Sequence, residues 1–305
     1  MDGSNADYVY NFAASSVLGL EGQKCFAACL SGLKRSDDCG RTWYNAYAGP
    51  AFDSSAPTLA VVVAPDFANE HLIVAGLAGG FLRSQDNGQH WEGIVLPSPP
   101  PTVSAMAISP NFSSDGIIFA ATLEDGVFCS NNRGQTWAAW NFGLLDLNVF
   151  CLALSPAFAC DETLLAGTES GIFRSTNGGR AWRELNLPCG FATVLALSFS
   201  PNYVSDGVIY AGTEASGIFC LDSSGSQWKR ISCDSLTGAI ASICPYLNGL
   251  LVVHNGEVLI TQDGNNFIPW QAEALKDVKV SALVSLDDRK TIVAGCVGGH
   301  LMRIA

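Results

Sequence analysis

Charged residues are scarce in this chain, and basic residues are scarcer than acidic ones. Charged side chains make up 14% of the 305 residues, and 16 Lys and Arg stand against 28 Asp and Glu, which gives a formal net charge of −12. A protein that binds nucleic acid through its phosphates needs clustered Lys and Arg, whereas the basic residues here are scattered without a run. The composition therefore argues against a nucleic-acid partner.

Long apolar runs are missing as well. The chain has no stretch of 18 apolar residues, so membrane insertion is not expected. Its start, residues 1–7, lacks the basic-then-apolar profile of a secretion signal. If Met1 is the natural start, we expect a cytoplasmic protein; a leader that had already been removed would leave a secreted or periplasmic location open.

The usual motifs of catalysis and metal binding are also absent. The 11 cysteines form no C-x-x-C pair, the 4 histidines have no H-x-x-x-H spacing, and neither a glycine-rich phosphate loop nor G-x-S-x-G is present. The sequence therefore predicts no catalytic residue, no metal site and no cofactor. The cysteines are expected to be small buried hydrophobes in a reducing compartment, with disulfides as the alternative, since five of them lie in apolar runs: Cys25, Cys29, Cys151, Cys244 and Cys296.

What the chain does contain is a polar turn of eight residues that recurs six times. The turns start at residues 36, 84, 130, 175, 221 and 261, in steps of 48, 46, 45, 46 and 40. Their characteristic residues are Ser36, Asp38, Gly40, Trp43; Ser84, Asp86, Gly88, Trp91; Ser130, Asn132, Gly134, Trp137; Ser175, Asn177, Gly179, Trp182; the weaker Ser223, Gly225, Trp228; and the degenerate Thr261, Asp263. Even spacing in this range indicates a repeat architecture.

Each repeat unit predicts four short strands. In the third unit, apolar runs at 103–109 and 117–122 precede a third run at 127–130, the polar turn and a fourth run at 136–140. Helical periodicity of 3.6 is absent, so the expected class is all-β. Four-stranded antiparallel sheets bury both faces when they stand around an axis, and 305 residues suit seven. We expect one seven-bladed β-propeller domain, 1–305, with blades beginning near 8, 56, 102, 148, 193, 238 and 278.

The polar turn has a structural explanation. Its Ser and its Asp or Asn can accept bonds from nearby backbone amides, its Gly accepts a positive φ, and its Trp can anchor the hairpin between blades. The pattern S-x-D-x-G-x-x-W resembles the Asp-box, or BNR repeat, of sialidases, sortilin-type receptors, xyloglucan-cleaving glycosidases and photosystem II assembly factor-like propellers. The resemblance implies that the box lies at the blade periphery, away from a ligand face.

An arginine recurs on the third strand just before the turn. It occurs as Arg35, Arg83, Arg174 and Arg303. Because this position is on an outer strand, we expect a structural role, either stacking on the Trp or pairing with the Asp of the box.

The last unit is incomplete, because the chain stops where its polar turn should begin. We expect a three-stranded last blade with 299–305 as an exposed edge, which would invite strand addition by a partner. The alternatives are a shortened chain, or residues 7–10 doubling back as the outer strand.

Two sets of residues are candidates for binding. The loop between the third and fourth units is apolar and carries Trp140, Phe142, Leu144 and Leu145; Glu124, Asp125, Glu169 and Glu214 lie at corresponding turns between second and third strands. An exposed apolar loop indicates a protein partner, and the acidic turns suit a basic partner segment or the carboxylate pair of a glycosidase. The favoured hypothesis is a non-enzymatic scaffold that binds another protein through the loops between blades. The alternative is a carbohydrate-active protein, either a hydrolase or a lectin-like binder.

Overall fold

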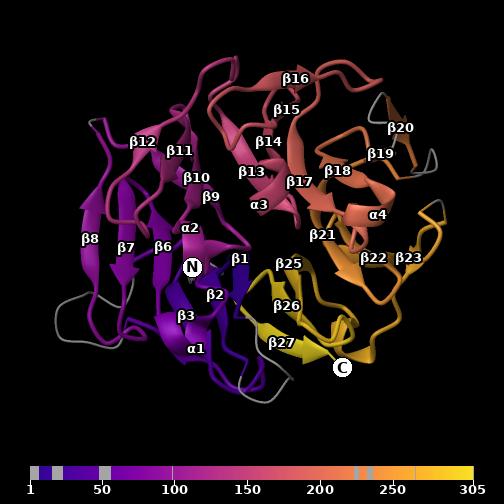
Figure 1. Cartoon of the computed structure of the whole chain (residues 1–305). Coiled ribbons are helices and arrows are strands. Elements are labelled where there is room, and N and C mark those ends of the chain that lie inside the picture. The colour runs from indigo at the N-terminus through magenta and orange to yellow at the C-terminus, as the bar shows by residue number, and fades with distance from the viewer. Residues whose placement is uncertain are drawn as a thin grey trace, which may run out of the picture.

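Seven small antiparallel sheets stand in a ring around a central axis (Figure 1). The computed structural model describes residues 7–15, 23–47, 56–97, 99–222, 227–231, 236–264 and 266–304. The predicted all-β class and the seven-bladed β-propeller are confirmed. Ser223 and Gly225 of the fifth turn lie outside the described residues.

The strands of each blade follow the chain from the inside of the ring to the outside. Blades 1 to 3 contain β1 (Val9–Ala14), β2 (Cys25–Cys29), β3 (Gly32–Ser36) and β4 (Tyr44–Asn45); β5 (Ala60–Val63), β6 (Ile73–Leu77), β7 (Gly80–Ser84) and β8 (Glu92–Val95); and β9 (Thr102–Ile108), β10 (Ile118–Leu123), β11 (Gly126–Ser130) and β12 (Ala138–Ala139). Blades 4 and 5 contain β13 (Val149–Leu154), β14 (Leu164–Thr168), β15 (Ile172–Ser175) and β16 (Arg183–Leu185); and β17 (Val194–Phe199), β18 (Ile209–Thr213), β19 (Ile218–Leu221) and β20 (Trp228–Arg230). Blade 6 contains β21 (Ile240–Tyr246), β22 (Gly249–His254), β23 (Glu257–Thr261) and β24 (Ile268–Pro269), and blade 7 contains β25 (Val280–Ser285), β26 (Ile292–Cys296) and β27 (Leu301–Ile304).

The last blade has three strands, as expected, and no described residue pairs with the outer edge of β27. Residues 7–10 do not double back along that edge, because Val9 begins the innermost strand of blade 1 and pairs with Cys29. Asp7 lies beside the turn before β27 instead, where its carbonyl accepts a hydrogen bond from the Gly298 N–H at 2.8 Å.

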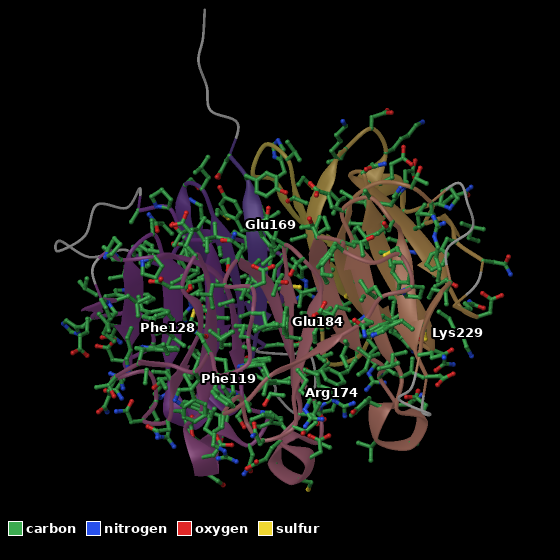
Figure 2. All side chains as sticks on the ribbon, turned by 90° about the horizontal axis from the view of Figure 1, so that it is seen from above. Phe119, Phe128, Glu169, Arg174, Glu184 and Lys229 are labelled. Atoms are coloured by element: carbon green, nitrogen blue, oxygen red, sulfur yellow. The ribbon has the colours of Figure 1, made fainter. Side chains whose placement is uncertain are left out.

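Short helical turns join the first and second strands of blades 2 to 5. They are α1 (Phe67–Glu70), α2 (Phe112–Asp115), α3 (Phe158–Asp161) and α4 (Tyr203–Asp206), and a 3-10 turn, η1 (Glu273–Leu275), precedes blade 7. The helices that can be seen in Figure 2 lie along one face of the ring, and all four join first to second strands, so we call this face the helix face. The opposite face, which carries the turns between second and third strands, is the turn face. None of the described helices is long and apolar enough to cross a bilayer.

The core lies at the seams between neighbouring blades, where facing sheets touch closely. A glycine on the second strand makes this approach possible in four blades, because a Cβ there would lie 2.5 to 2.8 Å from a side-chain atom of the facing blade: Gly76, Gly167, Gly212 and Gly295. The last of these faces Val9, so the ring closes between blades 7 and 1 by the same packing. The hydroxyl of Ser281 adds a bond to the Val9 carbonyl at 2.8 Å.

The cysteines are mostly part of this core. Cys25, Cys29, Cys39, Cys129, Cys244 and Cys296 are buried, Cys151 and Cys220 are half-buried, and Cys160 and Cys189 are exposed. None of these ten described cysteines forms a disulfide. Burial raises the pKa of the Cys25 and Cys244 thiols to about 12, so these groups stay protonated and act as small apolar side chains.

Candidate functional site

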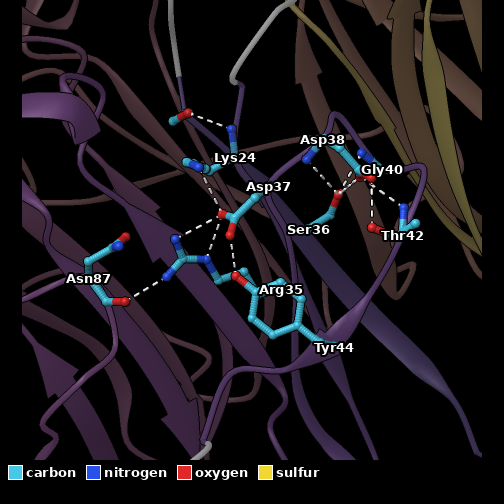
Figure 3. A network of polar contacts seen from close by, with 10 residues as sticks. Lys24, Arg35, Ser36, Asp37, Asp38, Gly40, Thr42, Tyr44 and Asn87 are labelled. Carbon is cyan, nitrogen blue, oxygen red and sulfur yellow. Dashed lines mark hydrogen bonds and ion pairs between the residues drawn. The ribbon is translucent and has the colours of Figure 1, made fainter.

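The polar turn of blade 1 is held by hydrogen bonds within itself (Figure 3). Ser36 Oγ donates to Asp38 Oδ1 at 2.8 Å and accepts from the Gly40 N–H at 2.8 Å. The Asp38 carboxylate also accepts the backbone N–H of Thr42 at 2.8 Å and its hydroxyl at 2.6 Å. The Thr42 bonds hold the pKa of Asp38 far below its ordinary value. This carboxylate is therefore committed to the turn and is not available to a ligand.

The same bonds recur in the next three turns. The Ser hydroxyl donates to the third residue and accepts from the Gly N–H in Ser84–Asp86–Gly88, Ser130–Asn132–Gly134 and Ser175–Asn177–Gly179, at 2.8 to 3.0 Å throughout. The degenerate sixth turn keeps part of the pattern, since Thr261 Oγ1 accepts from Gly264 N–H at 2.9 Å and donates to Asp263 at 3.2 Å. The turns lie on the helix face, because their backbones bond to residues that end the short helices, as Arg133 N–H does to Gly116 O at 3.0 Å.

The tryptophans of these turns pack against the preceding blade. Trp137 stacks on Phe81 of blade 2 at 4.1 Å, and Trp91 meets Tyr47 edge-on at 5.0 Å. The indole N–H of Trp43, Trp91 and Trp137 donates to the Gly carbonyl of its own turn at 3.1 to 3.2 Å. Trp182 differs: its side chain is 3% exposed, and its indole donates to the Trp140 carbonyl of blade 3 at 2.8 Å.

The recurring arginine also joins blades, but with different partners from those expected. Arg35 Nη1 donates to the carbonyl of Asn87, in the turn of blade 2, at 2.6 Å (Figure 3). Arg83 Nε likewise donates to the carbonyl of Arg133, in the turn of blade 3, at 2.8 Å. Neither arginine stacks on a box tryptophan. Arg35 pairs with Asp37, the second residue of its turn, and lies 5.6 Å from the Phe26 ring; Arg83 pairs with Glu92 at 3.5 Å.

The loop of residues 140–148, between blades 3 and 4, is anchored at both ends on the turn face. Asn141 Oδ1 accepts the Val127 N–H at 2.8 Å and its amide donates to the Asp125 carbonyl at 2.8 Å. At the far end, Asn148 Oδ1 accepts the Glu124 N–H at 3.0 Å, and its amide donates to the Glu169 carboxylate at 2.8 Å. The loop therefore connects the acidic turns of blades 3 and 4.

The apolar side chains of the 140–148 loop divide between the core and the solvent. Leu144 is 5% exposed and packs with Trp182 in the core, so it is not available to a partner. Trp140 is half-buried beside Phe119, with ring centres 6.4 Å apart. Phe142 and Leu145 are each 81% exposed. Phe142 and Leu145, two of the four predicted loop residues, are therefore exposed to solvent on a loop whose two ends are anchored by hydrogen bonds.

The acidic turns follow one another around the turn face. Glu124, Glu169 and Glu214 are exposed and Asp125 is half-buried; Figure 2 shows Glu169 toward the face opposite the helices. Among the described residues, none of these four carboxylates forms an ion pair within 4 Å. Asp146 adds a fifth carboxylate, which accepts the Ser170 N–H at 2.7 Å. The surface thus carries acidic groups that the described chain does not neutralise.

A small hollow lies next to Glu169. Its volume is about 180 Å³, and its lining includes Ser170, Glu184, Leu187 and Phe191. Drug-sized ligands occupy hollows of about 300–1,000 Å³, so this one suits a single side chain. Phe191 is 85% exposed and extends the apolar surface from the loop between blades 4 and 5.

A larger hollow lies elsewhere, between blades 6 and 7. It has a volume of about 1020 Å³, lies under residues 269–280, and is lined by Val258, Trp270, Leu275 and charged residues of both signs. The sequence of this segment gives no sign of the hollow, because it carries no repeat signal. No group of three or more potential metal ligands occurs within the described ranges.

The hydrogen bonds of Asp146 make the 140–148 loop sensitive to acid. Burial alone raises the pKa of its carboxyl, but bonds from Ser170 and from the Asn148 N–H outweigh it, and the pKa lies below the ordinary 3.8. Such a group stabilises the fold fully above its unfolded pKa and loses that contribution as the pH falls through the folded value. We expect the Ser170 amide resonance to titrate with a midpoint below 3.8, and the titration to vanish in Asp146→Asn. A midpoint at or above the ordinary value would contradict this.

Comparisons with known proteins match the fold but not the sequence. No family model matches the chain, and no curated protein matches its sequence. Among solved structures, the extracellular domain of a B. thetaiotaomicron protein described as a hybrid two-component system has a TM-score of 0.73 at 15% identity, over 99% of this chain and 38% of that one. The structure of YCF48 bound to a D1 peptide has a TM-score of 0.72 at 16% identity, over 99% and 94%. A GH74 enzyme of Niastella koreensis has a TM-score of 0.75 at 14% identity, over 98% and 52%.

The likeness is one of fold. At these identities the resemblance to Asp-box propellers is confirmed for the architecture. The chain spans less than two thirds of the B. thetaiotaomicron and Niastella chains and nearly all of YCF48.

Proposed function

We propose that this propeller is a non-enzymatic scaffold that binds another protein through the 140–148 loop and the acidic turns beside it. The observation that carries the proposal is the 81% exposure of Phe142 and Leu145 on a loop whose two ends are fixed by Asn141 and Asn148. Exposed apolar side chains on a fixed backbone mark interaction sites, because little conformational entropy is lost when the partner docks.

The charges beside the loop indicate which partner would bind. Asn148 joins the loop to Glu124 and Glu169, and Glu214 occupies the corresponding turn of blade 5. None of the three has a cationic partner within 4 Å among the described residues. A segment with Lys or Arg next to aromatic or aliphatic residues would fill the apolar surface and neutralise these carboxylates. The hollow of about 180 Å³ beside Glu169 would accept one of its side chains.

The comparisons support a protein partner at a coarse level. The YCF48 structure holds a D1 peptide, so a propeller of this architecture binds a protein segment. The ten described cysteines without a disulfide support a reducing compartment, and we propose the cytoplasm. We further propose strand addition at 299–305, where β27 ends its sheet.

Selection from a library of short random peptides on the immobilised full chain tests the main proposal. We expect selected peptides to combine basic with apolar residues, and Phe142→Asp with Leu145→Asp to weaken their binding at least about thirtyfold, as loss of a central apolar anchor does. Val204→Asp is the matched control, because Val204 is 79% exposed on α4 of the helix face. Equal weakening by the control, or no loss in the double variant, would overturn the proposal.

The alternative is a carbohydrate-active protein, and one observation favours it: a single residue, Asn148, bonds both the Glu124 backbone and the Glu169 carboxylate. Glycosidases place two carboxylates about 5–10 Å apart, and the GH74 neighbour has the same architecture. Hydrolysis of aryl-glycosides or β-glucans that is lost in Glu124→Gln or Glu169→Gln would establish this alternative. The scaffold proposal expects none.

A further inference from the structure

The outer edge of β27 lacks the bonds that a fourth strand supplies in the other blades. In blades 1, 3 and 6 a residue following the fourth strand donates its backbone N–H to the third strand: Ala46 to Leu33, Trp140 to Val127 and Trp270 to Val258, at 2.8 to 2.9 Å. The counterpart of Leu33 in blade 7 is Leu301, and no described residue pairs with its outer side. Since backbone groups alternate in direction along a strand, Leu301 and Arg303 both present an N–H and a C=O at this edge.

The side chain of Arg303 forms no ion pair of the kind that two of its three counterparts form. Arg35 pairs with the Asp37 carboxylate at 2.8 Å, and Arg83 pairs at 3.5 Å with Glu92, which lies directly opposite it on the fourth strand. Arg303 has no ion pair among the described residues, and its Nε is buried without a hydrogen-bond partner. Arg174 shares the bare Nε, but its fourth strand is present and places Arg183 opposite. Among these four arginines, only Arg303 lacks both an ion pair within 4 Å and a fourth strand opposite it, although the Asp288 carboxylate interacts with its charge at longer range.

We infer that an extended segment of a partner protein adds to β27 as the fourth strand of blade 7 and places a carboxylate opposite Arg303. This inference rests on the proposed function as a protein-binding scaffold. The strand would pair antiparallel to β27, as every described fourth strand does. Its acidic residue would lie on the same side of the sheet as Arg303, as Glu92 does with Arg83, and an ionised acceptor there would form a charge-assisted bond.

A second copy of this chain is a less suitable occupant. Edge-to-edge pairing of two β27 strands would bring together residues 301–304, Leu-Met-Arg-Ile, and this sequence offers no carboxylate to Arg303. Like charges facing each other across strands are destabilising. A heterologous strand with Asp or Glu at the facing position satisfies both the backbone and the guanidinium.

Amide exchange of the isolated full chain tests the exposed edge. We expect the amides of Leu301 and Arg303 to exchange at least tenfold faster than those of Leu33 and Arg35, which occupy the same positions on β3 beside β4. Slow exchange at the edge would overturn the inference, because the chain or a second copy would then already cover β27. Dependence of that protection on protein concentration would identify the second copy.

A peptide with the sequence of the outer strand of blade 2 tests whether the added strand must place a carboxylate opposite Arg303. Residues 91–97, Trp-Glu-Gly-Ile-Val-Leu-Pro, contain the strand that places Glu opposite Arg83. We expect the labelled peptide to bind the full chain, its Glu→Lys form to bind at least tenfold more weakly, and Arg303→Glu to reverse that preference. The reversal shows that the variant is folded. Arg183→Glu, on the exposed outer strand of blade 4, is the matched control and leaves the preference unchanged.

Equal affinity for the two peptides would overturn the inference. The variant with Phe142→Asp and Leu145→Asp should bind the Glu peptide as the unsubstituted chain does, because these residues belong to blade 3 and its loop. This comparison separates a wrong inference about strand addition to β27 from a wrong proposal about binding at the 140–148 loop.

Discussion

Replacing Trp182 by alanine is expected to lower the free energy of unfolding by about 3–5 kcal/mol, the usual cost of removing a large buried aromatic side chain. Trp182 is 3% exposed and packs with Leu144 and Phe173 at the seam between blades 3 and 4. Its indole also bonds the Trp140 carbonyl at 2.8 Å. The substitution would leave a cavity and an unsatisfied carbonyl together, and chemical denaturation measures the loss.

The same substitution should loosen the 140–148 loop. The indole N–H of Trp182 donates to the Trp140 carbonyl at the start of the loop, and its ring packs in the same cluster as Leu144. The alanine variant loses both contacts and keeps only the bond from its backbone N–H to the Phe142 carbonyl at 2.9 Å. Trp182→Phe is the control, since it keeps an aromatic ring and removes the indole N–H; it should cost about 1 kcal/mol. A loss below about 1.5 kcal/mol for the alanine variant would show that the seam collapses around the missing ring, contrary to the packing described.

Gly295→Ala is expected to lower the free energy of unfolding by about 1–3 kcal/mol by overpacking the seam that closes the ring. The new Cβ would lie 2.5 Å from Val9 Cγ1 and 2.6 Å from Val9 Cβ. These atoms belong to a β-branched side chain with little freedom to move aside, so either β1 or β26 must shift. We expect the amides of β1 to exchange faster. β1 is the innermost strand of blade 1, so it pairs with β2 on one side, and its packing against blade 7 is the contact that the substitution disturbs.

Two controls separate closure of the ring from general strain. Gly212→Ala meets Ile240 at 2.5 Å at the seam between blades 5 and 6, and should cost a similar amount without selectively exposing β1. Gly93→Ala meets no heavy atom within 4 Å, and should change stability by less than about 1 kcal/mol. If Gly295→Ala matched Gly93→Ala, the closing seam would not be tightly packed.

The architecture could be predicted because the repeat carries its own local physics. Within five residues of the first turn, the Ser36 hydroxyl bonds both the Asp38 carboxylate and the Gly40 N–H. Gly40 makes this geometry possible because it adopts a positive φ of 83°. Such a set of bonds needs no tertiary information, so its spacing revealed the number of blades. The three-stranded last blade followed from the same spacing.

The contacts between blades could not be predicted in the same way. Arg83 was expected to contact its own turn, yet its guanidinium reaches the Arg133 carbonyl, 50 residues ahead. The spacing of the repeats does not determine how close the third strand of one blade lies to the polar turn of the next. The short helices were missed for a different reason, since four residues such as Phe112–Asp115 cannot display a helical period.

The candidate surface was predicted in composition but not in detail. The apolar loop and the acidic turns were identified, but the sequence could not show that Leu144 turns inward while Phe142 and Leu145 turn outward. The burial of Leu144 depends on its packing against Trp182, which belongs to the polar turn of blade 4. The anchoring roles of Asn141, Asp146 and Asn148 were missed too, although three residues with amide or carboxylate side chains in eight positions are typical of a hydrogen-bonded loop.

The closure of the ring has a consequence for how the gene product could be rearranged. The joint between the first and last blades relies on Val9, Gly295 and Ser281, which make the same kind of contact as the internal joints, and Asp7 already touches Gly298. The position of the chain ends within the ring is therefore of little energetic consequence. A circular permutant in which a linker joins residue 304 to residue 7, and in which the new chain ends lie within another polar turn, should fold into the same seven-bladed propeller.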